Sequence, residues 1–146
     1  MRKLLGLLTL LLLISSCGNS IETANTLTEQ DLDRLHTLKL LDKNEHLYKF
    51  YSEFKNSIAG NFYSNKRLAS YWLDEHDKSK SKIEYAFYTD IIKIDTVYYA
   101  GATYCPYMLI TKTDSSSFKV CVDGTKKEIT DFFNDAIDKW KRQKMK

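Results

Sequence analysis

The residues best suited to acid–base or metal chemistry are consecutive: Asp74, Glu75, His76 and Asp77. Carboxylates and imidazole bind divalent cations, so this group is a candidate cation site. Metal sites usually take their ligands from several elements held at a fixed geometry, whereas these four residues open a charged run that continues to Lys82. We therefore expect a solvated helix end followed by a surface loop here, and we predict no metal.

Three serines, Ser115–Ser117, are candidate nucleophiles. Asp and Ser favour tight connections, and the sequence ties no histidine to these serines, so a turn explains them better. The chain has no metalloprotease helix motif, nucleophile elbow, phosphate-binding loop or paired-cysteine zinc motif. The sequence leaves open whether the protein is an enzyme, favours a nonenzymatic one and offers no catalytic residue.

Tyrosines form the strongest candidate for a binding surface. The chain has 10 tyrosines in 146 residues, and four of them lie close together at Tyr98, Tyr99, Tyr104 and Tyr107. Tyrosine gives a broad contact area with a polar tip and is enriched where proteins bind one another. Alternating aromatic residues are also typical of a half-covered sheet, and this packing interpretation is the one that the sequence favours.

Cys105 and Cys121 are a candidate disulfide of the expected domain. A bridge that closes a loop of about 17 residues stabilises a protein by about 3 kcal/mol on the chain-entropy estimate. The strand pairing that we predict puts Cys121 opposite Ile110, well along the strand from Cys105, and argues against an easy bridge. Pro106 can bend the strand and bring Cys105 within the roughly 7 Å between alpha carbons that a disulfide requires. The sequence leaves open whether Cys105 and Cys121 are bridged or free.

The third cysteine, Cys17, follows an export signal. Met1–Lys3 carry positive charge, and Leu4–Ile14 form an uninterrupted, largely apolar stretch. A membrane-spanning helix needs roughly 20 apolar residues, because a helix rises about 1.5 Å per residue and the bilayer core is about 30 Å thick. The stretch is too short to span a bilayer and is typical of a secretory signal that is removed after export.

Residues 13–17, Leu-Ile-Ser-Ser-Cys, resemble the lipobox of bacterial lipoproteins. The family more often has Leu at the position of Ile14 and Gly or Ala at that of Ser16. The resemblance implies that Cys17 carries a diacylglycerol, that a dedicated peptidase cuts between Ser16 and Cys17, and that an acyl chain such as palmitate joins the new amino terminus. An ordinary signal peptide, cut near Ser16 by the general signal peptidase, is the alternative.

Lipidation decides where the protein resides. Two or three acyl chains hold a protein stably at a membrane, because each buried methylene contributes about 0.8 kcal/mol. Gly18 resembles the residue of lipoproteins that pass to the outer membrane. We therefore expect a lipid-anchored protein of the bacterial cell envelope, at the outer membrane and in the periplasm, with the covalent lipid on Cys17 and no other cofactor.

The charges of the exported part nearly cancel. Of the 22 Lys and Arg residues, Arg2 and Lys3 belong to the signal, and the rest face 19 Asp and Glu residues. The basic balance of the precursor is therefore no reason to expect nucleic-acid binding. The chain beyond the signal is long enough for one domain and too short for two. We predict a cleaved signal at 1–16, a lipidated Cys and flexible tether at 17–27, and a single globular domain at 28–146.

The first part of this domain has helical spacing. Thr28 precedes acidic residues and predicts a capped helix start. Apolar residues then recur at threes and fours as far as Ile58, so we expect two helices or one long helix that ends before Gly60. The same spacing predicts a third, shorter helix over residues 66–75.

The spacing changes to alternation after the charged run. Residues 83–101 predict two strands with a break near 95 and 96. Residues 107–113 and 118–123 predict a hairpin in which the facing ends, Thr113 and Phe118, pair. A final amphipathic helix follows, with Thr125 and Glu128 as a capping box or Thr130 as a later start. Its apolar stripe is Ile129, Phe132, Phe133, Ala136, Ile137 and Trp140.

These elements predict an α+β fold, in which N-terminal helices are followed by a small antiparallel sheet with a C-terminal amphipathic helix packed on it. The expected function is a nonenzymatic, partner-binding role in the envelope, of the assembly, inhibitor or immunity type, with an envelope protein or glycan as partner. The alternative is a small envelope enzyme or ligand-binding domain that uses the Asp74–Asp77 group or the tyrosine-rich sheet face.

Overall fold

The structure is a computed structural model that describes residues 19–102 and 104–145. The predicted signal and Cys17 lie outside the described residues. The elements in chain order are α1 (Glu29–Thr37), β1 (Leu47–Tyr51), β2 (Ala59–Ser64), β3 (Arg67–Trp72), η1 (Lys78–Lys80), β4 (Lys82–Phe87), η2 (Tyr88–Asp90), β5 (Ile91–Val97), β6 (Tyr107–Lys112), β7 (Ser117–Cys121) and α2 (Lys126–Lys144).

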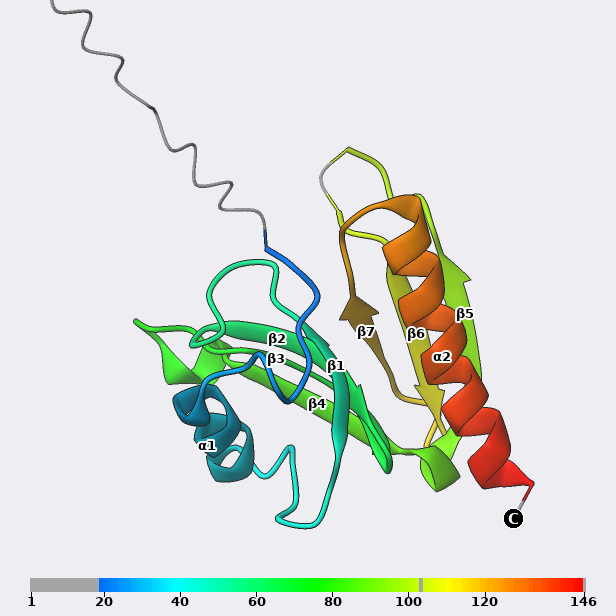
Figure 1. Cartoon of the computed structure of the whole chain (residues 1–146), viewed down its shortest axis with the longest axis horizontal. Helices are drawn as coiled ribbons and strands as arrows, with labels where there is room; N and C mark the ends of the chain where they lie inside the picture. The colour runs from blue at the N-terminus through cyan, green and yellow to red at the C-terminus, as the bar shows by residue number, and fades with distance from the viewer. Residues whose placement is uncertain (1–18, 103, 146) are drawn as a thin grey trace, which may run out of the picture.

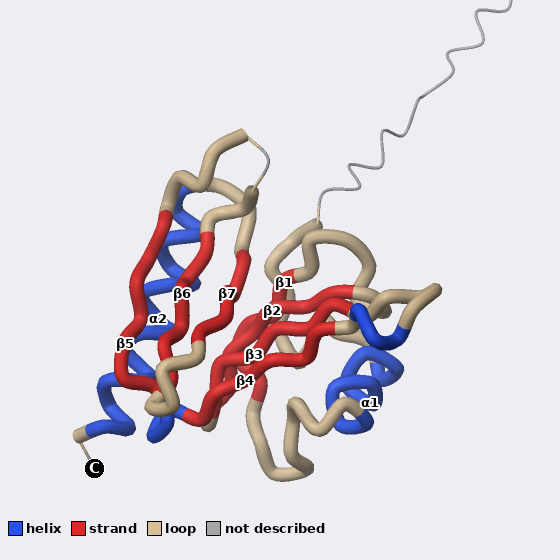
Figure 2. Tube along the Cα trace, turned by 180° about the vertical axis from the view of Figure 1, so that it is seen from behind, coloured by secondary structure: helices blue, strands red, loops and turns tan. Residues whose placement is uncertain are grey.

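Two antiparallel sheets lie side by side (Figures 1 and 2). The first has the order β1-β2-β3-β4 and the second the order β5-β6-β7. The short helix η2 connects them, and β7 is the strand of the second sheet that lies against β2 and β3. The α+β class is confirmed, but the predicted single small sheet is instead a pair of sheets.

Both faces of the four-stranded sheet are buried over β2 and most of β3, while β4 is largely exposed. One apolar cluster lies under α1 and includes Leu35, Phe50 and Phe62. The other fills the space between the two sheets and α2, where Tyr63 and Phe132 meet edge to face with ring centroids 4.9 Å apart. The second cluster draws residues from both sheets, so the sheets share one core.

The prediction of several N-terminal helices was wrong. Thr28 does cap α1, where its side chain accepts the Asp31 amide, but residues 47–51 and 67–72 are strands. Strand β1 has a register shift between Leu47 and Lys49, and all six residues of β2 are buried. A bulge and burial on both faces remove the period of two by which a strand is recognised, and the remaining spacing imitates a helix.

Gly60, which we expected to lie beyond a helix end, is inside β2. A Cβ at this position would come within 2.4 Å of the Tyr71 ring and 2.6 Å of the Phe50 ring. The sequence has glycine here because two aromatic rings cover the strand, which leaves no room for a side chain.

The second half of the chain is closer to prediction. The strands of residues 83–101 are present as β4 and β5, but the break falls at η2 rather than near residue 95. Tyr88 fixes the break, because its hydroxyl donates to the Ser64 carbonyl (2.7 Å) and its amide to the Lys66 carbonyl (3.0 Å). In the β6–β7 hairpin, Phe118 pairs with Ile110 instead of Thr113.

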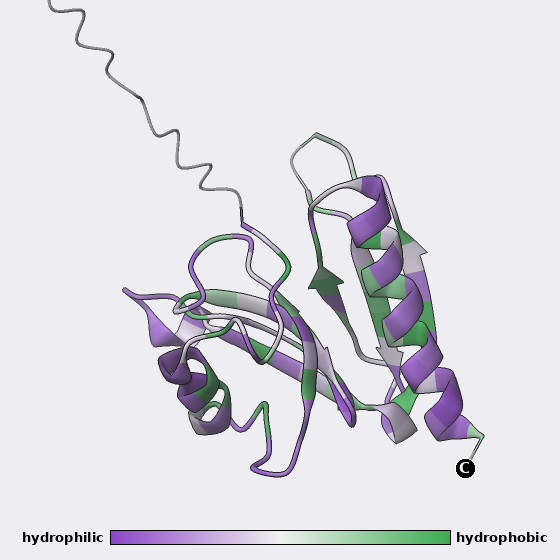
Figure 3. Ribbon diagram, in the orientation of Figure 1, coloured by the Kyte–Doolittle hydropathy of each residue, from purple (hydrophilic) through white to green (hydrophobic). Residues whose placement is uncertain are grey.

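Helix α2 begins as predicted. The Thr125 and Glu128 side chains each accept from the other's backbone amide, which completes the capping box. The apolar side of α2 faces β5–β7 and the hydrophilic side faces outward (Figure 3). Trp140 adds a hydrogen bond of 3.3 Å from its indole to the Ile91 carbonyl.

The predicted tether is part of the folded structure over its described length. Glu22 and Phe50 exchange two backbone hydrogen bonds of 2.7 and 2.9 Å, Ile21 packs against the core, and Leu27 is buried. The segment lacks periodicity because it adds a single bridge to the edge of β1, too short a pairing to leave a pattern. Among the residues that the structure describes, no helix is both long and apolar enough to cross a membrane.

Candidate functional site

The carboxylates of the Asp74–Asp77 group are occupied by local backbone contacts. Asp74 accepts the amides of His76 (2.9 Å) and Asp77 (2.8 Å), and Asp77 accepts the amide of Ser79 (3.0 Å). These hydrogen bonds hold the pKa of both aspartates below its usual value. Across residues 19–102 and 104–145, no group of three His, Cys, Asp or Glu residues could hold a metal ion.

The serines lie in the β6–β7 turn. Asp114 accepts from the amide of Ser116 (2.9 Å) and from its hydroxyl (2.5 Å), and Ser115 has a φ of 68°. A carboxylate that orders a tight turn in this way explains the cluster without chemistry.

The predicted tyrosines gather at one end of the three-stranded sheet, mostly off its face. Tyr98, Tyr99 and Tyr104 are 48, 85 and 64% exposed and belong to the β5–β6 connection, while Tyr107 begins β6. The ammonium of Lys119, a residue of β7, lies 5.2 Å from the Tyr104 ring and 4.4 Å from the Tyr107 ring, so one lysine contacts both tyrosines. The predicted tyrosines therefore do not form a sheet face, because three of the four lie in the loop between β5 and β6.

Cys105 and Cys121 form a disulfide, with alpha carbons 5.8 Å apart. The register explains why the predicted obstacle is absent. Cys121 pairs with Tyr107 rather than with Ile110, and the Val122 amide continues the pairing to the Pro106 carbonyl (2.9 Å). The true register therefore brings Cys121 next to the residues that precede β6, within reach of Cys105.

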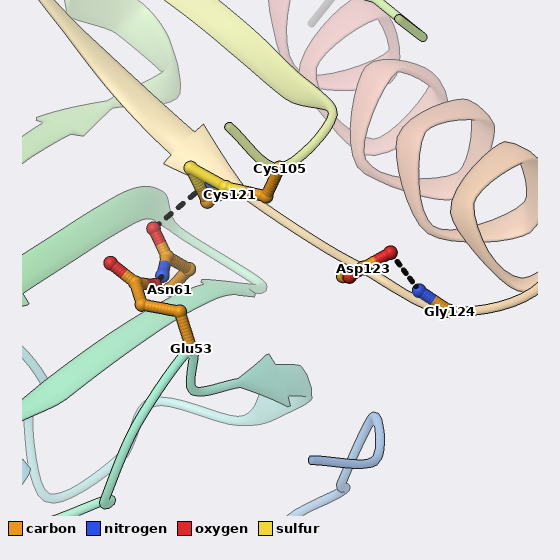
Figure 4. The surroundings of a disulfide bond; sticks show 6 residues. All are labelled: Glu53, Asn61, Cys105, Cys121, Asp123 and Gly124. Carbon is orange, nitrogen blue, oxygen red and sulfur yellow. Dashed lines mark hydrogen bonds between the residues drawn. A yellow bond between two sulfur atoms is a disulfide. The ribbon is translucent and has the colours of Figure 1, made fainter. Parts of the chain in front are cut away.

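A cleft of about 440 Å³ opens beside this disulfide, where the segment after β1 meets the end of the β6–β7 pair that lies opposite the turn. Figure 4 shows Glu53 beside Asn61, and Asp123 beyond Cys121 with its carboxylate hydrogen-bonded to the Gly124 amide. The cleft has a volume typical of small-ligand sites in proteins. Its lining residues are Tyr51, Glu53, Ala102, Tyr104, Cys105, Cys121 and Asp123.

Asn61 holds the floor of the cleft. This buried side chain on β2 donates to the Glu53 carboxylate (2.6 Å) and accepts the Cys121 amide (2.9 Å), as drawn in Figure 4. One amide therefore orients Glu53 and joins the two sheets. Burial of the carboxyl group raises the pKa of Glu53, and the Asn61 hydrogen bond opposes part of that rise.

Tyr51 differs from the other buried tyrosines. The hydroxyls of Tyr63, Tyr71 and Tyr88 donate to the Asp135 carboxylate, the Asn56 carbonyl and the Ser64 carbonyl. Tyr51 is only 5% exposed, yet its hydroxyl has no protein partner within the part of the chain that the structure describes. Because every fully buried side-chain N or O in that part is hydrogen-bonded, the Tyr51 hydroxyl must be the part of the side chain that reaches the cleft.

The two carboxylates converge electrostatically on this hydroxyl. Burial first, then the charges of Asp123 and Glu53, raise the pKa of Tyr51 to about 12. The phenol therefore stays protonated at neutral pH, with a donor hydrogen and free lone pairs. No Lys, Arg or His is among the described residues that line the cleft. The arrangement suits a positively charged group with hydrogens to donate.

A somewhat larger hollow, of about 510 Å³, lies between β4 and the β6–β7 turn. Its charged residues have mixed signs, with Lys112 between Glu84, Asp90 and Asp114. Asp114 is already bound within its turn, and the one buried residue among the described lining is Ala86, which has no polar side-chain atom. We therefore regard the cleft at the disulfide as the candidate site.

A buried ion pair elsewhere has a structural role. Arg67 donates two hydrogen bonds to Glu45, Nε to Oε1 (3.0 Å) and Nη2 to Oε2 (2.7 Å), and a third to the Lys39 carbonyl (3.2 Å). The Phe87 ring centroid is 4.3 Å from the guanidinium carbon. With its donors engaged and its face covered, Arg67 fastens the loop before β1 to β3 and leaves nothing for a ligand.

Comparison with known proteins gives no family for this chain. No family model matches, and no curated protein matches. Among solved structures, the chain is similar to a DUF1696 family protein with a pleckstrin-homology domain from Shewanella loihica PV-4, at 15% identity and a TM-score of 0.48, over 79% of this chain and 98% of the other.

Sequence reasoning found the disulfide and Tyr104 but missed the residues that make the cleft acidic. Glu53 was assigned to a helix that does not exist, and Asp123 to the end of a hairpin. Their separation in the sequence leaves no motif. The one usable signal was Asn61, a polar residue inside an apolar run, of the kind that usually serves a specific partner when buried.

Proposed function

We propose that this protein is a nonenzymatic, lipid-anchored protein of the bacterial cell envelope that binds a positively charged group of its partner in the cleft beside the Cys105–Cys121 disulfide. The observation that carries the binding role is the Tyr51 hydroxyl. The Tyr51 side chain is 5% exposed, and its hydroxyl reaches the cleft without a protein partner among the described residues, where two carboxylates act on it. Such a group supports a ligand that completes its hydrogen bonding.

The chemistry of the lining favours an ammonium group. A hydrogen bond to a charged group contributes about 1.5–3 kcal/mol, and a cation over an aromatic ring about 0.5–2 kcal/mol. Glu53 and Asp123 supply the charge, Tyr51 an oxygen, and Tyr104 an exposed ring at the rim. The disulfide adds an apolar wall for the carbon chain that carries the ammonium.

The anchor rests on the sequence alone. The signal, the lipobox-like residues 13–17 and Gly18 support a diacylglycerol on Cys17 and an outer-membrane location. Substitution Cys17→Ser should abolish labelling by radioactive fatty acid and leave unprocessed precursor. Normal labelling of the variant would overturn the anchor.

The binding role is tested by titrating the protein with n-butylammonium and following the amide NMR signal of Cys121, whose hydrogen is bonded to Asn61. We expect saturable shifts. The double variant Glu53→Gln with Asp123→Asn should bind about tenfold more weakly, since a loss of 1.4 kcal/mol is tenfold in affinity. Both substitutions preserve side-chain shape and the contacts to Asn61 and Gly124.

A matched control separates the site from net charge. Asp74→Asn with Asp77→Asn removes the same charge from a surface turn outside the cleft, and should leave the affinity unchanged. Equal weakening in both double variants would reduce the effect to overall charge. An absence of saturation in the unsubstituted protein would contradict the binding role.

A further inference from the structure

The β5–β6 connection is an exposed aromatic segment without charged residues of its own, although Lys119 of β7 lies against the rings of Tyr104 and Tyr107. From Tyr98 to Ile110 the sequence contains no Asp, Glu, Lys, Arg or His, although charged residues make up 28% of the chain. Tyr99 is 85% exposed, and Tyr98 and Tyr104 are about half exposed or more. Exposed aromatic residues that no charge interrupts are typical of a surface that meets another apolar or interfacial surface.

The connection between β1 and β2, in the first sheet, also has an exposed aromatic residue. Phe54, 52% exposed, lies in the segment between β1 and β2, which begins beside the cleft at Glu53. The Lys55 ammonium lies over the Phe54 ring, 5.4 Å from its centroid. Exposed aromatic residues therefore occur in both connections near the cleft: Tyr104 lines it, and Phe54 follows the lining residue Glu53 in the chain.

The described part of the chain begins on the side of the molecule where the β5–β6 connection lies (Figures 1 and 2). In Figures 1 and 2, the first described segment of the chain starts beside the segment between β1 and β2, and the β5–β6 connection extends to that side as well, while the C-terminus lies on the opposite side. The hydrogen bond from Asn56 to the Glu22 carboxylate (2.8 Å) fixes the incoming chain against this segment.

Little chain is available to separate this side from a lipid on Cys17. Ile21 and Glu22 already pack on the domain, so only residues 18–20 lie between them and Cys17. An extended chain spans at most about 3.3–3.6 Å per residue, which limits the gap to roughly 15 Å. A domain on so short a connection turns its attached side toward the membrane.

We infer that the tyrosines of the β5–β6 connection lie in the membrane interface, and that the positively charged group bound in the cleft is the primary ammonium of a phosphoethanolamine lipid head group. This inference rests on the proposed function and names its ligand. Tyrosine is enriched at membrane–water interfaces because its ring is apolar and its hydroxyl is polar.

The charges around the cleft match such a head group. A primary ammonium has three hydrogens to donate, and Tyr51, Glu53 and Asp123 provide oxygens to accept them. The phosphate beside the ammonium carries a negative charge, and Lys119 lies next to the cleft, with its ammonium 5.2 Å from the Tyr104 ring. A negative head group without an amine would meet the two carboxylates and be repelled.

The test compares the mature lipidated protein in detergent and in vesicles, with hydroxyl-radical labelling of tyrosines read by mass spectrometry. Vesicles contain phosphatidylethanolamine or, in its place, phosphatidylglycerol, and flotation establishes that the protein is bound. Tyr85 on β4, 41% exposed and outside the cleft, is the internal control. We expect Tyr99 to be labelled faster than Tyr85 in detergent and more slowly than Tyr85 in phosphatidylethanolamine vesicles.

The head group is read from Tyr104. Its labelling should be lower in phosphatidylethanolamine than in phosphatidylglycerol vesicles, and this difference should disappear in the Glu53→Gln, Asp123→Asn variant. Unchanged labelling of Tyr99 in both vesicles, or equal shielding of Tyr104 by both lipids, overturns the inference. The n-butylammonium titration is made without a membrane, so a negative result in vesicles leaves the proposed binding of an ammonium group intact. Failure of the titration would instead contradict the proposed function.

Discussion

The polar side chains near the core differ in whether protein groups satisfy their hydrogen bonds. Arg67 is 2% exposed and has Glu45 on two of its nitrogens, a carbonyl on a third and an aromatic ring on its face. Tyr51 is as deeply buried and has no protein partner in the described chain. The first pattern is that of a structural pair, and the second is the observation on which the proposed ligand site rests.

The structural pair can be tested through Glu45. Substitution Glu45→Ala leaves the Arg67 charge buried, with only Asp42 at 2.9 Å to offset it. We expect the free energy of unfolding in urea to fall by about 3 kcal/mol, because an unpaired buried charge typically costs about 3–5 kcal/mol. Lys127→Ala, which breaks an exposed pair with Asp131, should cost about 0.5 kcal/mol or less. Similar losses in the two variants would contradict the structural role of Arg67.

Glu53 should make the free energy of unfolding depend on pH. Its folded pKa is raised by burial, so the folded protein is stabilised by the protonated form and is weakened as pH rises through that pKa. Glu53→Gln does not titrate and keeps an oxygen for Asn61. The variant should therefore unfold at higher urea than the unsubstituted protein at pH 7, with the difference shrinking as pH falls toward about 4, the ordinary pKa of Glu. An opposite slope would mean that Glu53 is stabilised as an anion.

At the scale of elements, the disulfide joins the β5–β6 connection to the end of β7, and so holds one wall of the cleft. The double substitution Cys105→Ala, Cys121→Ala should lower the free energy of unfolding by about 3 kcal/mol on the chain-entropy estimate. It should also weaken n-butylammonium binding, because Tyr104 is next to Cys105. A variant that loses stability but binds normally would remove the disulfide from the site.

The sequence was informative for elements that keep one face in water. Helix α2 was predicted with its cap and its stripe, since its outer face is polar and the period of the apolar residues is undisturbed. Strands β1 and β3 were mistaken for helices and β2 was not predicted, because burial on both faces, together with a bulge in β1, erased the alternation. The hairpin was found but its register was not, because residues 107–110 of β6 are apolar on both faces. The pattern therefore did not show that Met108 and Ile110, rather than Leu109, are buried.

At the scale of the whole molecule, the cleft exists because the two sheets meet. Tyr51 and Glu53 come from the edge of the first sheet and Asp123 from the end of the second, and Asn61 ties the sheets together at this point. The hydrogen bond between Asn61 and Cys121 joins residues 60 positions apart in the chain. Local patterns carry no information about such a junction, so the cysteines and Tyr104 could be predicted as candidates while the site that they border could not.

The central claim is that the cleft binds an ammonium group, and isotope-filtered NMR tests it most directly. With n-butylammonium present, we predict nuclear Overhauser contacts from its methylene protons to the ring protons of Tyr51 and Tyr104, and none to Tyr85. Contacts to Tyr85 without contacts to Tyr51, or binding with no contact to Tyr51 and Tyr104, would contradict it.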